Sequence, residues 1–170
     1  MFHLTEIDCA ALVKIGDRFL DVGEFHSVFF RPEVFSATYP EFGRGVQAVL
    51  SDVLRSSFLG AVVPQLVPLD FKAAMKFAVL NRYEFEGSLI GALLQGTCTA
   101  SVVDDERDAR EKVRIILDGA LLKPDGALFA FRMDDPSWSA LTSGATFSWA
   151  YFVYEASQKL WWFVCFADYY

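Results

Sequence analysis

The sequence predicts an α+β fold, in which four to five helices pack on an antiparallel sheet formed mainly by the C-terminal third. Three patterns predict this class. Helical apolar stripes fill most of the first two-thirds of the chain, a Pro-Gly turn precedes an apolar strand, and two aromatic runs around a polar break close the sequence. The chain has 170 residues, of which 54% are hydrophobic. We therefore expect a single globular domain, residues 1–170, with a well-buried core.

The C-terminal segment has the pattern of a β-hairpin. Aromatic and aliphatic residues fill 147–154 and 160–170, and the polar residues of 155–159 separate the two runs. Alternate residues of a strand point to opposite faces, and neither run has a polar face. Both faces of the hairpin are therefore expected to be covered. Either the hairpin is the centre of the domain's own sheet, or one of its faces is a recognition surface for a partner.

Helices are predicted wherever apolar residues recur with a period of 3.6 and capping residues flank the stripe. Thr5 and Gly16 bracket the first such segment, and Asp70 precedes a stripe formed by Phe71, Met75 and Val79. The predicted helices cover residues 6–15, 45–59, 70–79, 84–95 and 104–122.

The segments between these helices are expected to be strands and loops. Bulky residues predict extended chain at 18–30, and an apolar strand is expected at 127–133 after a turn at 123–126. Residues 97–103 fit either a short strand or a loop. An ordered loop is expected at 31–44, where Pro and Gly punctuate aromatic residues, an apolar connector at 61–69 and a polar loop at 137–145.

Charge and composition exclude several classes of function. The formal net charge is −7, which disfavours nucleic-acid binding because phosphate contacts need clustered Lys and Arg, and which favours a basic protein partner. No apolar run is long enough to cross a bilayer, and no basic segment followed by an apolar one opens the chain. We therefore expect no membrane contact, no signal peptide and a cytoplasmic location. The three cysteines are odd in number and widely spaced, which is typical of reduced thiols.

No motif for catalysis or metal binding is present. Nucleophile, zinc, phosphate-loop and dinucleotide fingerprints are all missing. Glu24 and His26 would share one side of a strand, but two such residues alone do not make a metal or acid–base site. No catalytic residue, metal or cofactor is therefore predicted.

Two functions remain open. The first is a non-catalytic protein-binding domain, one version of which is an immunity-type inhibitor that occludes a basic toxin. The second is a small enzyme or ligand-binding domain with a pocket between sheet and helices, for which His26, Glu24, Tyr151 and Tyr154 are the first candidates. Homo-oligomerisation is compatible with either. The predicted partner-binding residues are Trp149, Tyr151, Trp161, Trp162, Tyr169, Tyr170, Tyr39, Phe42, Asp134 and Asp135.

Overall fold

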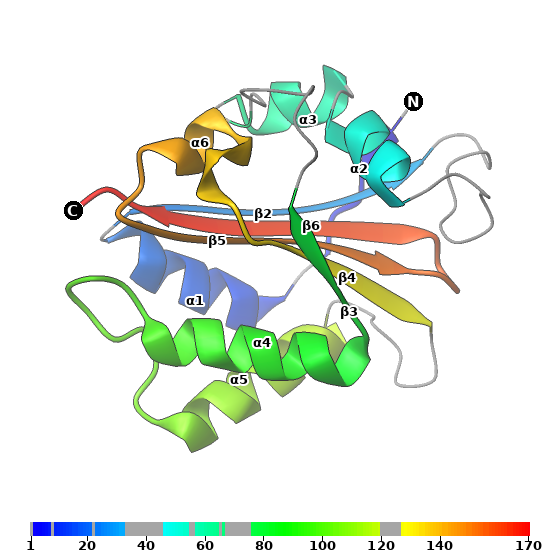
Figure 1. Ribbon diagram of the computed structural model, residues 1–170. Helices are drawn as coiled ribbons and strands as arrows, with labels where there is room; N and C mark the ends of the chain where they lie inside the picture. Colours follow the sequence, from blue (N-terminus) through cyan, green and yellow to red (C-terminus); the bar gives the residue numbers. More distant parts are fainter. Residues whose placement is uncertain are drawn as a thin grey trace.

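The centre of the molecule is a six-stranded antiparallel sheet with the strand order β1-β2-β6-β5-β4-β3 (Figure 1). This computed structural model describes residues 2–7, 9–21, 23–32, 46–54, 57–64, 66, 76–119 and 127–170. The strands are β1 (Phe2–Leu4), β2 (Glu24–Pro32), β3 (Phe77–Leu80), β4 (Leu128–Met133), β5 (Phe147–Glu155) and β6 (Leu160–Asp168). The predicted α+β class is confirmed, and the C-terminal third supplies β4, β5 and β6.

Helices cover both faces of this sheet (Figure 1). One face packs against α1 (Ala10–Leu20), α4 (Arg82–Gln95) and α5 (Glu106–Gly119). The other packs against α2 (Val46–Leu54), α3 (Ser57–Val62), α6 (Ala140–Ser143) and the short 3₁₀ helix η2 (Pro136–Trp138). The described part of the chain thus holds six α-helices, because α2 and α3 divide the segment predicted as one helix and α6 lies in a predicted loop.

The predicted hairpin is confirmed as β5 and β6, and it is the core of the sheet. All nine residues of β6 are buried. Trp162 faces α4, where its ring lies 6.1 Å from that of Phe85, and Trp161 faces the other way, with its ring 5.0 Å from that of Tyr154. Burying a large apolar side chain stabilises a fold by about 1.5–3 kcal/mol. The two aromatic faces therefore hold the two helical layers of this chain together.

The polar break between the runs is the hairpin turn. The buried carboxylate of Glu155 accepts hydrogen bonds from the backbone N–H of Ser157, at 3.2 Å, and of Gln158, at 2.7 Å. Lys159 adopts a positive φ of 53°, which closes the turn before β6. Glu155 is thus buried with its charge satisfied by the turn that it organises.

The first helix begins later than predicted. Thr5 does not cap it, because the Thr5 N–H donates to the carbonyl of Phe29 at 2.9 Å and so extends the pairing of β1 with β2. The residue before the helix is Cys9, whose side chain makes no capping hydrogen bond. The predicted helix bounds of 6–15 were therefore wrong, because Thr5, the predicted cap, pairs with β2 instead.

The predicted helix at 70–79 is wrong where the structure describes it. Ala78 and Val79 belong to β3, which pairs with β4. The true helix start follows at Asn81, whose side chain accepts from the N–H of Glu84 while the Glu84 carboxylate accepts from the N–H of Asn81. Residues 67–75 lie outside the described part of the chain.

Of the extended chain predicted at 18–30, residues 18–20 belong to α1 and residues 24–30 to β2. The helix predicted at 104–122 is α5, the strand predicted at 127–133 is β4, and 97–103 is a loop. The turn predicted at 123–126 lies outside the described residues. No helix of the described part is both long and apolar enough to cross a membrane.

Candidate functional site

Four of the predicted partner-binding residues are core residues. Trp149, Tyr151, Trp161 and Trp162 are 7%, 2%, 0% and 1% exposed. Their side chains pack in the two hydrophobic cores of this chain, although Trp149 also borders a small hollow. The interpretation of the hairpin as the centre of the domain's own sheet is the one that the structure confirms.

The other described candidates are accessible. Tyr169 and Tyr170 are 46% and 77% exposed, and the Tyr169 hydroxyl donates to the carbonyl of Leu141 in α6. Tyr39 and Phe42 lie outside the described residues. The C-terminal tyrosines are thus available at the surface beside α6, and their partner-binding role stays a prediction.

Asp134 and Asp135 have local partners. Asp134 accepts from Nε of Arg132 at 2.8 Å. Asp135 begins η2 by accepting from the N–H and hydroxyl of Ser137, and the hydroxyl contact is the main reason that the pKa of this carboxyl is lowered. Asp134 also borders a small hollow of about 230 Å³ beside β5, which Trp149 shares.

The residues predicted for an enzyme pocket do not converge. Nε2 of His26 lies 3.4 Å from Oε2 of Glu24, as expected for two residues on one side of a strand. Tyr151 and Tyr154 belong to opposite faces of the sheet. Within the described ranges, no group of three His, Cys, Asp or Glu side chains could hold a metal ion.

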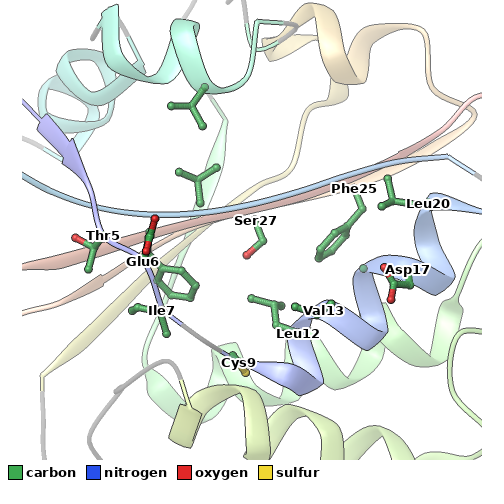
Figure 2. Close-up of a pocket in the computed structure, with 14 residues that line it drawn as sticks. Thr5, Glu6, Ile7, Cys9, Leu12, Val13, Asp17, Leu20, Phe25 and Ser27 are labelled. Carbon is green, nitrogen blue, oxygen red and sulfur yellow. The ribbon is translucent and has the colours of Figure 1, made fainter.

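A groove of about 560 Å³ lies between α1 and β2 and is called here the α1–β2 groove. Figure 2 shows Phe25 and Ser27 on β2 above α1, with the segment from Thr5 to Ile7 at one end. Its lining is mostly apolar and includes Ile7, Leu12, Val13, Leu20, Phe25 and Val62.

Helix α1 forms one wall and places apolar side chains at the surface. Leu12 and Phe19 are buried against the sheet, whereas their neighbours Val13 and Leu20 are 60% and 58% exposed. The helix lies close to β2 at Gly16, where a Cβ atom would be only 3.0 Å from the Phe25 ring. Gly16 therefore serves close packing in the middle of the helix and does not end it.

Strand β2 forms the other wall and presents a free backbone edge. β1 pairs only with the end of β2, from Phe30 to Pro32, and no described strand pairs with residues 24–28 on the side away from β6. The carbonyl of Phe29 points to this side, because it accepts from Thr5. In a regular antiparallel strand the outward groups alternate, so the N–H and C=O of Phe25 and Ser27 also point into the groove edge.

Ser27 links the groove to the core. Its Oγ accepts from Nε1 of the buried Trp162 at 2.9 Å. No residue of the described part accepts a hydrogen bond from the Ser27 hydroxyl itself. Because a hydroxyl can donate while it accepts, this group can still donate to a molecule in the groove.

The charge of the groove is negative. Its lining includes the carboxylates of Glu6 and Asp17, both exposed, and holds no Lys or Arg among the described residues. Arg18 is next in sequence but points elsewhere, since its guanidinium donates to the carbonyl of Val102 at 2.9 Å and lies 3.9 Å from Asp104. The groove is therefore suited to a ligand that has apolar groups and positively charged groups close to one another.

The Asp168 carboxylate and the thiols of Cys98 and Cys165 lie in environments that shift their pKa values. Desolvation acts to raise the pKa of Asp168, but hydrogen bonds from the N–H groups of Cys98 and Tyr170 outweigh it and lower the pKa. Desolvation and the Asp168 carboxylate raise the pKa of the Cys98 thiol, and burial raises that of Cys165. Thiols with raised pKa values are poor nucleophiles at neutral pH.

The sequence contained one signal for the groove that the predictions did not use. Leu12-Val13 and Phe19-Leu20 are adjacent apolar pairs seven residues apart. Such pairs widen an apolar stripe beyond the width that one core face needs. The free edge of β2 could not be found in this way, because it depends on where β1 stops.

Comparisons with known proteins add no functional information. No family model matches the chain, and a search of curated proteins finds no match.

Proposed function

We propose that this chain is a non-catalytic protein-binding domain whose partner docks on the α1–β2 groove, and that it acts as an immunity-type inhibitor that occludes a basic toxin. The observation that carries the proposal is the exposure of Val13 and Leu20 beside an edge of β2 that no described strand pairs with. Clustered apolar side chains at a surface are typical of docking sites, where a few such residues supply most of the affinity.

Charge supports a basic partner. Glu6 and Asp17 lie in the groove, and the whole chain carries a formal net charge of −7. Complementary charge speeds the encounter of two proteins and fixes their register. A toxin that acts on nucleic acid is basic, because phosphate contacts need Lys and Arg, and this acidic chain lacks that excess of positive charge.

The assignment of a non-catalytic role is supported by how the polar groups are used. The Glu155 carboxylate accepts a hydrogen bond within the β5–β6 turn, and the Asp168 carboxylate accepts one from the backbone N–H of Cys98. The Cys98 thiol has a raised pKa. These groups stabilise backbone conformation, and none of them belongs to the lining of the groove.

A second candidate is a ligand-binding domain. The groove volume of about 560 Å³ lies within the range of small-molecule sites, and Ser27 would supply a hydroxyl among apolar groups. This candidate predicts binding of a small apolar compound that does not depend on the charges of Glu6 and Asp17.

The experiment is a capture of partners by the tagged chain from native extract at low and at high salt, followed by reconstitution with the purified partner. The groove variant is the double substitution Val13→Ser with Leu20→Ser. The matched control is Val79→Ser, because Val79 is 51% exposed on β3 at the opposite edge of the sheet.

We expect one basic protein to bind the native chain and the Val79→Ser control at low salt, and to be lost at high salt and from the groove variant. Binding of the native chain should also suppress the toxic activity of that protein. Capture of no basic protein would contradict the proposed function. Equal binding of the purified partner by both variants would remove the groove as its docking site.

A further inference from the structure

We infer that the α1–β2 groove takes a short, extended, basic segment of the partner protein as an added strand on the free edge of β2. The inference rests on the proposed function and specifies how the partner is recognised. In strand addition, backbone hydrogen bonds to an open sheet edge supply affinity, and side-chain pockets on either side supply selectivity.

The geometry of β2 carries the first step. Residues 24–30 pair with β6 in one uninterrupted register, so β2 has no bulge that would twist its outer edge away. Phe25 and Ser27 turn their N–H and C=O groups outward. An added strand can therefore form a continuous ladder with the existing sheet over this stretch.

The length of the segment is bounded at both ends. Thr5 occupies the edge at Phe29. At the other end, β2 itself begins at Glu24. Between these limits lies room for about five extended residues, or about 17 Å.

The side chains of the groove set the composition of the segment. The segment needs apolar side chains opposite Val13 and Leu20 of α1, because binding would bury these two exposed apolar groups. Glu6 and Asp17 require Lys or Arg beside them. The segment thus combines Val, Ile or Phe with basic residues.

Other occupants fit these features less well. A small apolar molecule would cover the backbone groups of Phe25 and Ser27 without pairing them, and unpaired polar groups are costly to bury. A second copy of the chain would bring Glu6 and Asp17 against identical carboxylates. An extended basic segment satisfies both the backbone edge and the charge.

The probes are acetylated and amidated peptides of about five residues, in which each position is varied among Val, Phe, Ser, Lys and Glu. They are screened against the full chain and against the Val13→Ser, Leu20→Ser variant. We expect the native chain to select peptides that combine Val or Phe with Lys, and to reject those with Glu. If no peptide binds the native chain more tightly than the Val13→Ser, Leu20→Ser variant, the inference is overturned.

Two further measurements test the mode of binding. Methylation of the peptide amides that face β2 should weaken binding at least about tenfold relative to methylation of the intervening amides, because only the first set donates to the ladder. Asp17→Lys should shift the preference from Lys toward Glu. Equal effects of the two methylation patterns would exclude strand addition, and an unchanged charge preference would exclude the role of Asp17.

The outcomes separate this inference from the proposed function. A basic partner that binds through the groove but is not displaced by the selected peptide would retain the function and overturn strand addition. A selected peptide without any basic partner in native extract would retain the strand site and contradict the function. A dimer of the free chain that Val13→Lys dissociates would identify a second copy as the occupant and overturn the inference.

Discussion

Replacing Ser27 by Ala is expected to destabilise the whole fold, although Ser27 lies at the rim of the groove. The Ser27 hydroxyl accepts the hydrogen bond from Nε1 of Trp162, which is 1% exposed. Removing the acceptor leaves a buried N–H group without a partner, which costs about 1–3 kcal/mol. For a chain of this size each kcal/mol lowers the melting temperature by about 2–4 °C, so the expected decrease is roughly 2–12 °C.

The assay is urea unfolding followed by tryptophan fluorescence, with thermal melting as a second measurement. Ser27→Thr is the matched control, because it retains the hydroxyl on a residue type that strands favour. A double-mutant cycle with Trp162→Phe isolates the pair, since Phe has no N–H to lose. The reasoning is refuted if Ser27→Ala leaves the free energy of unfolding unchanged, or if Ser27→Thr costs as much as Ser27→Ala.

Three further predictions concern other parts of the fold. Asn81→Ala removes the capping box of α4 and should cost about 0.5–2 kcal/mol by urea unfolding, with Asn81→Ser as the conservative control. Gly96→Ala should lower the melting temperature, because φ at Gly96 is 66° and a Cβ would lie 2.6 Å from the carbonyl of Ala100. This strain should exceed the stabilisation that Gly→Ala gives at an unstrained position, and an unchanged melting temperature would contradict the prediction. The folded-state pKa of Asp168 is lowered, so its contribution is complete above the unfolded pKa of about 3.9 and is lost as the pH falls through the folded pKa. Unfolding curves of Asp168→Asn should therefore differ from those of the native chain at neutral pH and converge below about pH 4, and a constant difference across this range would show that the carboxylate is not responsible.

The parts of the fold that could be predicted are those set by local patterns. The β5–β6 hairpin follows from two runs without a polar face, and α5 follows from its apolar stripe and acidic first turn. The predictions failed where tertiary pairing overrides local preference. Thr5 pairs with Phe29 in the sheet although it is a residue type that caps helices, and Val79 pairs with Phe131 in β3 although it lies on an apolar stripe with helical spacing.

The candidate site was not predicted, for a related reason. Aromatic residues were expected at the surface, but Trp161 and Trp162 are buried because helices of the same chain cover both faces of the hairpin. The groove instead depends on the short β1, which leaves most of the outer edge of β2 without a partner strand among the described residues, and on Val13 and Leu20. Only the two side chains had a signal in the sequence, since the extent of strand pairing is a property of the whole sheet.

Residue-resolved amide hydrogen exchange of β2 measures whether the outer edge of this strand is open to a partner strand. In the free chain, the account predicts alternation: the N–H groups of Phe25 and Ser27 exchange quickly, while those of His26 and Val28, which face β6, are protected. Adding the selected basic peptide should slow exchange at Phe25 and Ser27 and leave the other two unchanged. Phe25 and Ser27 amides that are already as slow as His26 and Val28 in the free chain, or that do not respond to the peptide, would contradict the account.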